Sequence, residues 1–198
     1  LLAQAAQQAG FSVSDEELQA RIDKLVSEIG GADKLTEWQA KYLFTEESFI
    51  TYLKRSVLVA WQRDQITDAV PLTADQVHAR QLIYQDEADA NAALAALQGG
   101  TAFTQLAEAQ DPVLGGELGW FPQGTLTQPV VEEALFALQP GEFTAVIKSE
   151  IGYHIVQMLE REPDHPLSVE ARRMLQEKAL DQWLTEKRAV STIEVLVP

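Results

Sequence analysis

The run Gly115-Gly116-Glu117-Leu118-Gly119-Trp120-Phe121 constrains the fold more than any other stretch of this chain. Three glycines within five residues exclude a helix interior, because glycine loses more backbone freedom on ordering than any other residue. Leu118, Trp120 and Phe121 are too apolar for a solvated linker. The run therefore predicts a tight turn that leads into a short buried strand, whose backbone passes close to another part of the protein.

Strand and helix patterns alternate on both sides of this glycine motif. Residues 77–84 predict a strand, Asp86 begins an alanine-rich helix that ends at Gly99-Gly100, and Thr101 caps a short helix. Downstream, residues 129–138 predict a helix, and residues 143–148 and 153–159 predict a hairpin of strands around Gly152. This order is typical of a small antiparallel sheet covered by helices.

The first seventy residues carry helix patterns instead. Ser14 and Glu17 form a capping-box pattern, and Gly30-Gly31 ends the helix that begins there. Residues around Trp38 predict a short second helix. Thr45 caps a longer third helix, which runs to about residue 69.

A last amphipathic helix is predicted over residues 168–188, after the boundary prolines Pro163 and Pro166. Its apolar face needs a partner, and so do the apolar faces of the first segment. We therefore expect a helical lobe built from residues 1–70 and 163–198, with residues 71–162 as a separate domain inserted between them. The tail from Ile193 to Val197 is interpreted as a short edge strand or an ordered tail.

The net charge of −15 is concentrated in the middle of the chain, where residues 71–162 hold 13 acidic and 3 basic side chains. A nucleic-acid-binding protein needs a basic face, and an anionic membrane would repel this chain. The charge serves solubility or attracts basic, unfolded polypeptides. With no cysteine, the chain forms no disulfide and no thiolate metal site, and both oxidising and reducing compartments remain compatible.

The sequence contains no apolar run that approaches the ~18 residues of a membrane span, so we expect no membrane insertion by this segment. It begins with Leu1 rather than Met, and residues 1–6 are typical of the middle of a helix. These observations favour a leader, anchor or first helix that lies outside this sequence.

Gly115 to Phe121, the helix after it, the turn Pro140-Gly141 and the later Gly152-Tyr153-His154-Ile155 together resemble the second half of a parvulin-type peptidyl-prolyl cis/trans isomerase domain. The helical segments around this domain resemble those of bacterial foldases and chaperones of the PrsA and SurA type. The resemblance implies an α+β fold, in which a four-stranded antiparallel sheet with covering helices is inserted into an all-α chaperone-like lobe. It also implies an extracytoplasmic location and clients that are unfolded, proline-containing polypeptides.

Isomerisation of an X-Pro bond requires no nucleophile, metal or cofactor. The barrier of ~18–20 kcal/mol comes from amide conjugation. A protein lowers it by gripping the proline ring and stabilising the twisted amide in an apolar pocket with a few polar groups.

The resemblance supplies candidate site residues. Leu118, Leu126 and Val131 match the positions that line the proline pocket, with one extra residue between Leu126 and Val131. Asp111 and His154 match polar positions of the catalytic site. Trp120 and Phe121 are interpreted as core or as pocket wall. Plain core packing is the alternative for the three pocket residues and for His154, and a turn cap is the alternative for Asp111.

Two departures from the family pattern bear on activity. Gln81 stands where the first strand usually carries a histidine, and His78 lies three residues earlier, on the opposite face of a strand. Val131 replaces a phenylalanine. These differences leave two functions open: a peptidyl-prolyl isomerase that assists the folding of exported proteins, or a holdase-type chaperone whose parvulin domain has weak or no isomerase activity. The segment Gln85-Asp86-Glu87 is acidic, which argues against phosphate recognition.

Overall fold

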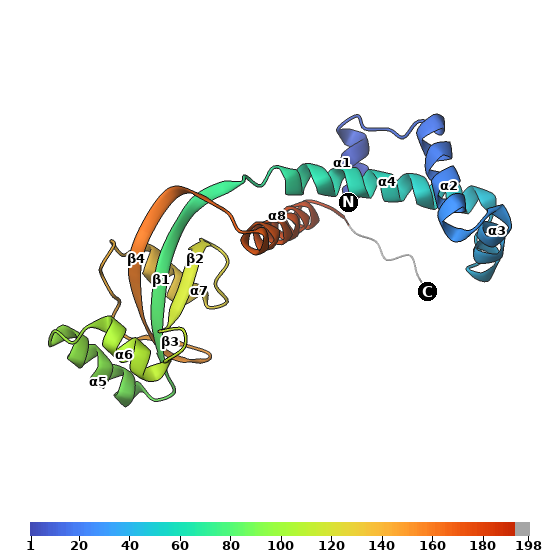
Figure 1. The fold of residues 1–198 in the computed structure, drawn as a ribbon. Helices are drawn as coiled ribbons and strands as arrows, with labels where there is room; N and C mark the ends of the chain where they lie inside the picture. Colours follow the sequence, from blue (N-terminus) through green and yellow to red (C-terminus); the bar gives the residue numbers. More distant parts are fainter. Residues whose placement is uncertain (193–198) are drawn as a thin grey trace. The chain divides into compact units, whose positions relative to one another are not determined.

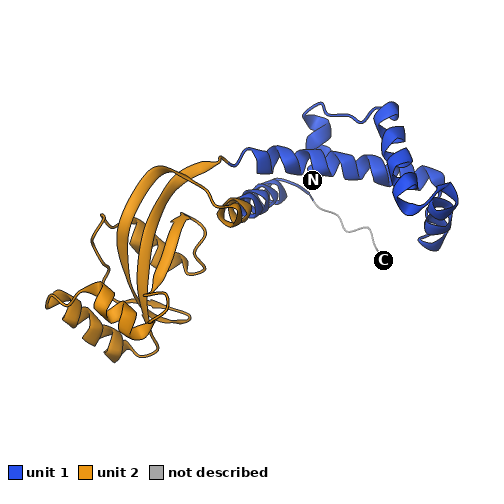
Figure 2. Ribbon diagram, viewed as in Figure 1, with its two compact units in different colours: residues 1–70, 176–198 blue, residues 71–175 orange. Residues whose placement is uncertain are grey.

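The computed structural model describes residues 1–192 and has an α+β fold (Figure 1). The tail from Ile193 to Val197, interpreted above as an edge strand or an ordered tail, lies outside the described residues. Its contacts divide the chain into two compact units (Figure 2). Unit 1 contains residues 1–70 and the segment from residue 176 onward, and unit 2 contains residues 71–175. Among the described residues, no helix combines the length and the apolar character that a membrane span requires.

Unit 1 is helical. Its helices are α1 (Leu2–Gln8), α2 (Asp15–Ile29), α3 (Ala32–Lys41), α4 (Glu46–Asp68) and the part of α8 (Val169–Ala189) that follows residue 175. The amide of Glu17 donates to Ser14 Oγ at 3.1 Å, so Ser14 caps α2 as the sequence predicts. The side chain of Glu17 does not complete a capping box, because it accepts from Arg21 at 3.0 Å.

Helix α8 contacts the N-terminal segment within unit 1. Gln176 Nε2 donates to the carbonyl oxygen of Thr67 at 3.1 Å, which ties α8 to the end of α4. Leu184 of α8 lines the same cavity as Leu1 and Leu2 at the start of the chain. The ring of Phe11 stacks on Trp61 of α4 with centroids 4.6 Å apart.

Unit 2 is built on one antiparallel sheet with the strand order β2-β1-β4-β3. The strands are β1 (Thr73–Tyr84), β2 (Glu117–Pro122), β3 (Ile147–Ser149) and β4 (Gly152–Pro166). The glycine motif thus ends in strand β2, as predicted. The strand predicted over residues 143–148 is shorter, since residues 143–146 contribute only an isolated bridge from Phe143 to Gln157.

Strand β4 continues past residue 162, where the sequence placed the end of the isomerase-like domain. The first residues of β1 pair with this extension, with Gln76 opposite Glu162 and Thr73 opposite Pro166. The side-chain amide of Gln76, which is 1% exposed, also donates to the carbonyl oxygens of His165 and Pro166. Unit 2 therefore includes the proline-containing segment that looks like a linker in the sequence.

Helices cover both faces of the sheet. Helices α5 (Glu87–Gln98) and α6 (Phe103–Gln110) cover one face, where Leu82 and Ile155 are fully buried. Helix α7 (Pro129–Phe136) covers the other face, where Val77, Ala79 and Val156 are fully buried. Because side chains alternate along a strand, Gln81 of β1 and His154 of β4 share the α7 face.

Candidate active site

His154 lies on β4 and is 2% exposed. Its Nε2 atom lies 2.7 Å from the hydroxyl oxygen of Ser149, the last residue of β3. Its Nδ1 atom is buried and has no hydrogen-bond partner among the described residues. The alternative of a fully satisfied core histidine therefore does not describe this side chain, because one buried ring nitrogen lacks a hydrogen-bond partner among the described residues.

Burial lowers the pKa of His154 below its ordinary value of 6.5. Burial penalises the imidazolium form, and no carboxylate pairs with this ring among the described residues. The imidazole is therefore neutral near pH 7. A neutral ring presents one donor and one acceptor, so it exchanges one hydrogen bond with Ser149 and keeps the other group free.

Gln81 lies on β1 opposite Val156, and His154 lies opposite Ile83. Gln81 and His154 are therefore diagonal neighbours on one face, a spacing at which long side chains of adjacent strands can meet. The structure brings these two predicted site residues together.

The backbone of Gln81 is held by the glycine motif. Its amide donates to the carbonyl oxygen of Gly116 at 2.8 Å. Gly116 has φ +71°, and a Cβ atom built on it would collide with the carbonyl oxygen of Gln81. The close approach predicted for this motif is therefore the contact between Gly116 and the strand that carries Gln81.

Asp111 ends α6 and stabilises the loop before this glycine contact. Its Oδ1 atom accepts from the amides of Leu114, at 3.0 Å, and Val113, at 3.1 Å. These donations, that of Leu114 first, lower the pKa of the Asp111 carboxyl group, and the amide of Gly116 contributes in the same direction. The structure thus gives Asp111 the turn-capping role that the sequence left as an alternative.

The apolar candidates gather beside α7. Val131 and Phe121 are 3% and 7% exposed within the core cluster on that face, and Leu118 and Leu126 pack against the cluster while keeping part of their surface accessible. Leu118 and Leu126 therefore offer apolar surface to a ligand, whereas Phe121 is core.

Trp120 does not belong to this group. It pairs with His78 across the strands and its ring stacks on His78 and His165, with centroids 5.5 and 4.2 Å apart. His78 alternates with Val77 and Ala79, so this stack lies on the face opposite His154. The sequence left Trp120 as core or pocket wall. A bulge in the pairing of β1 and β2 separates Leu118 from Trp120, so their side chains lie on different faces, and Trp120 does not line a pocket with Leu118.

Ser149 is the site residue that sequence reasoning missed. Besides its contact with His154, its hydroxyl oxygen accepts from the amide of Ile151 at 3.1 Å, which tightens the β3–β4 turn. Its position five residues before His154 was a usable signal, because a two-residue turn in a hairpin brings such residues onto neighbouring positions.

The arrangement is suited to noncovalent catalysis. It combines a neutral imidazole, a hydroxyl group and a carboxamide with partly exposed apolar side chains. Among residues 1–192, no group of three or more His, Asp or Glu side chains is arranged to hold a metal ion.

Comparison with known proteins identifies the relatives of this chain. Residues 72–173 match the family described as PPIC-type PPIASE domain, that is, peptidyl-prolyl cis/trans isomerase domain. The chaperone SurA of Thiobacillus denitrificans is 32% identical over 146 residues, which are 63% of this chain and 33% of that protein. The foldase protein PrsA of Caldanaerobacter subterraneus is 29% identical over 163 residues, which are 79% of this chain and 52% of that protein.

Solved structures show the same fold. A PrsA structure from Bacillus cereus has a TM-score of 0.66 at 20% identity, over 98% of this chain and 82% of that one. A PrsA structure from Bacillus anthracis has a TM-score of 0.55 at 23% identity, over 98% of this chain and 97% of that one. The chain spans about a third of the length of the Thiobacillus SurA and about half of the length of the Caldanaerobacter PrsA. Since the family match covers just over half of the chain, the chain belongs to the PPIC-type peptidyl-prolyl isomerase family.

Proposed function

We propose that this chain is a peptidyl-prolyl cis/trans isomerase that assists the folding of exported, proline-containing polypeptides outside the cytoplasm. The observation that carries the proposal is the convergence of His154, Ser149 and Gln81 with Leu118 and Leu126 on the α7 face of the sheet. Family membership favours catalysis over the alternative of a holdase without isomerase activity.

In this proposal, the proline ring of a client rests on Leu118 and Leu126 beside buried Val131. Apolar contact removes water from the ring and from the amide that rotates. The neutral ring of His154 and the carboxamide of Gln81 then offer hydrogen bonds to the carbonyl oxygen and nitrogen of the twisted amide. Hydrogen bonds that form only in the twisted state lower the barrier without tightening ground-state binding.

The test measures cis/trans isomerisation of a panel of proline tetrapeptides by the whole chain and by the variant His154→Ala. We expect acceleration by the wild-type chain and a loss of about tenfold or more in the variant, since one well-placed hydrogen bond of ~1.4 kcal/mol corresponds to a factor of ten. His78→Ala is the matched control, because His78 lies in the same sheet on the opposite face. Equal rates in His154→Ala and wild type would contradict the site.

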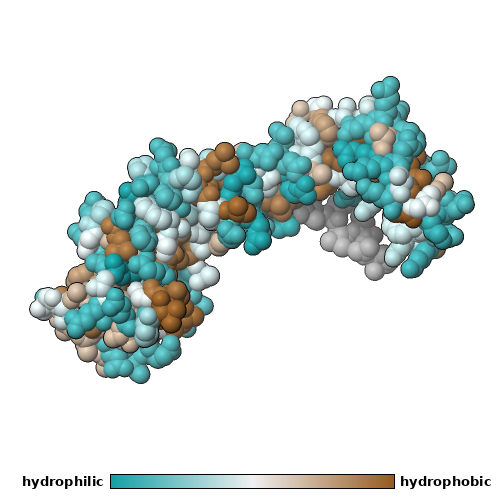
Figure 3. All heavy atoms as spheres, in the orientation of Figure 1, coloured by the Kyte–Doolittle hydropathy of each residue, from teal (hydrophilic) through white to brown (hydrophobic). Residues whose placement is uncertain are grey.

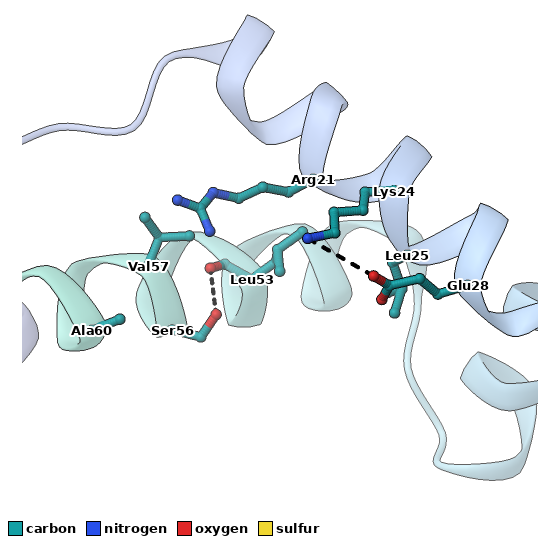
Figure 4. Close-up of a pocket in the computed structure, with 8 residues that line it drawn as sticks. All are labelled: Arg21, Lys24, Leu25, Glu28, Leu53, Ser56, Val57 and Ala60. Carbon is teal, nitrogen blue, oxygen red and sulfur yellow. Dashed lines mark hydrogen bonds and ion pairs between the residues drawn. The ribbon is translucent and has the colours of Figure 1, made fainter.

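Unit 1 supports the chaperone part of the proposal. An apolar groove with a volume of about 440 Å³ lies between α2 and α4 and is lined by Leu25 of α2 and by Leu53 and Val57 of α4, with Arg21 and Lys24 of α2 beside them (Figure 4). A neighbouring cavity of about 280 Å³ shares Leu25 and Leu53 and adds aromatic side chains. Figure 3 shows apolar surface among hydrophilic residues over α2 and α3.

The aromatic side chains beside this groove are accessible. Trp38, Tyr42 and Tyr52 are 39%, 54% and 53% exposed, and Trp38 lies against Tyr42 and Phe44 with ring centroids 4.9 and 5.6 Å apart. Exposed apolar surface of this kind marks interaction sites. We propose that extended client segments bind here. The double variant Tyr42→Ser/Tyr52→Ser should suppress client aggregation less than wild type, whereas Val190→Ser, at an 81% exposed position, should not differ from it.

A further inference from the structure

Glu132 is a buried acidic residue next to the proposed proline pocket. It lies in the first turn of α7, directly after Val131, and is 7% exposed. Among the described residues, no basic side chain forms an ion pair with it. A buried carboxylate without a cation is costly unless other donors compensate its lost hydration. Its partners therefore indicate why the chain has a glutamate there.

Those partners are three consecutive amides of one loop. Glu132 Oε1 accepts from the amides of Gly124, Thr125 and Leu126 at 2.8, 2.9 and 3.0 Å. Three backbone donors converging on one carboxylate oxygen fix the loop at three adjacent points. Hydrogen bonds to a charged acceptor are also stronger than those between neutral groups. A single side chain of α7 thus sets the path of the loop that follows β2.

This loop carries a residue of the proposed pocket. Leu126, whose own amide is the third donor, packs against the core cluster beside Val131. The hydroxyl group of Thr125 donates to the carbonyl oxygen of Pro122 at 2.8 Å, which holds the loop at its start. Glu132 holds it at the pocket.

We propose that Glu132 is a positioning residue of the isomerase site, which holds Leu126 at the proline pocket through the amides of residues 124–126. This inference rests on the proposed function, because it assigns Leu126 to the grip on proline. Glu132 itself does not contact the client. Its effect on isomerisation passes through the loop and depends on the side chain of Leu126.

The first experiment tests the anchor without any need for activity. Hydrogen exchange of the three loop amides is measured by NMR in wild type, Glu132→Ala, Glu132→Gln and the control Glu133→Gln, whose side chain is exposed on the same helix. We expect exchange about tenfold faster in Glu132→Ala and intermediate in Glu132→Gln, which keeps an acceptor oxygen but loses the charge. Glu133→Gln should match wild type. Unchanged exchange in Glu132→Ala would overturn the proposal.

The second experiment tests the dependence on Leu126. For a proline tetrapeptide, kcat/KM should fall about tenfold in Glu132→Ala, mainly through a higher KM, because a misplaced contact weakens the grip on the ring. Leu126→Ala should show a similar loss, and adding Glu132→Ala to it should cause little further loss, since residues that act through one contact are not additive. Additive losses, or a normal kcat/KM despite faster exchange, would assign Glu132 a structural role only.

Failure of the proposed function has a different signature. If wild type does not accelerate isomerisation, the proposed function fails, and the affinity for the same tetrapeptide is then read from amide shift titration. Weaker binding in Glu132→Ala than in Glu133→Gln would still support positioning of the pocket. Equal affinity in the two variants, or no binding by wild type, would overturn it. If Glu132→Ala does not fold, Glu132→Gln provides the same comparisons.

Discussion

Among single residues, His154 couples the stability of unit 2 to pH. Its pKa in the folded chain lies below 6.5, whereas in the unfolded chain the ring is solvated and titrates near that value. Below about pH 6.5 the unfolded state therefore binds a proton that the folded state does not. The stability that neutral His154 contributes is present above this pH and is lost as the pH falls toward the lowered pKa.

We therefore expect the free energy of unfolding to decrease between pH 7 and pH 5 more steeply in wild type than in His154→Gln. Glutamine does not titrate, and the other ionisable groups are the same in both proteins. Denaturant unfolding at several pH values, followed by the indole N–H NMR signal of Trp120, measures the difference in slope. Trp120 is the one tryptophan of residues 71–175 in the sequence. If the two proteins lose stability equally over this pH range, the pKa of His154 is the same in the folded and unfolded states, which contradicts the prediction.

At Gln81 we predict a substitution that raises isomerase activity. Gln81→His places a second imidazole diagonal to His154, where the family pattern has one. An imidazole shares a proton as glutamine cannot, so kcat/KM should rise by up to about tenfold, the effect of one improved hydrogen bond. The tetrapeptide assay measures the change. An unchanged or lower kcat/KM, with an intact fold by circular dichroism, would show that position 81 does not take part in catalysis.

At the level of elements, the sequence predicted most of what local chemistry decides. The caps at Ser14 and Thr45 and the turn into β2 follow from residue type, and the structure has them. Thr101, by contrast, does not cap α6, whose N-cap is Ala102. The length of β4 was missed because it depends on pairing with β1, which lies far away in the sequence. Gln76 of β1 and His165 of β4, which form a hydrogen bond, are 89 positions apart. Ser149 and Glu132 were missed for another reason: their partners lie only five to eight positions away, but those contacts depend on how the β3–β4 turn and the loop after β2 fold, which residue type alone does not decide.

The β2 turn yields a prediction about two glycines with similar backbone angles. Gly116 and Gly119 have φ +71° and +70°, so a side chain at either position adopts a strained conformation that costs about 1–2 kcal/mol. Only at Gly116 does an added Cβ meet another atom, the carbonyl oxygen of Gln81; the Cβ at Gly119 has nothing within 4 Å. Gly119→Ala therefore reports strain alone, and Gly116→Ala reports strain plus a collision.

We expect Gly116→Ala to lower the free energy of unfolding of unit 2 by at least about 2 kcal/mol more than Gly119→Ala, as overpacking against backbone does. Because the shift also displaces the backbone of Gln81, isomerase activity should fall in Gly116→Ala alone. Thermal unfolding with Trp120 as reporter and the tetrapeptide assay measure both effects. Equal destabilisation by the two substitutions would mean that the approach of Gly116 to β1 is looser than the structure has it.

At the level of the whole molecule, the chain passes from unit 1 into unit 2 and back. A single helix has no core of its own, so the last helix buries its apolar face within unit 1, with the helices from the start of the sequence. The apolar face of the last helix, which has no partner within its own segment, was the sequence feature that suggested this arrangement. The residue at which the chain re-enters unit 1 could not be predicted. The prolines at 163 and 166 indicate a boundary, but residues 163–175 make their contacts within unit 2.

A truncation tests this organisation. A chain that ends at Leu175 keeps all of unit 2 and loses Leu184, which lines a cavity with Leu1 and Leu2, and Gln176, which binds the carbonyl oxygen of Thr67. Loss of the partly buried side chains of this helix should destabilise unit 1 by about 2–4 kcal/mol. Unit 2 should keep its stability, because its sheet and three covering helices remain.

Hydrogen exchange resolved by segment measures the two units in one experiment. In the truncated chain, amides of α1 and α4 should exchange faster, whereas those of β1 and β4 should keep their wild-type rates, since local opening reports the stability of each cooperative unit separately. Isomerase activity on a tetrapeptide should be retained, and suppression of client aggregation should weaken. Equal losses of protection in both units, or full protection of α1 and α4, would show that the C-terminal helix does not stabilise the helices of residues 1–70.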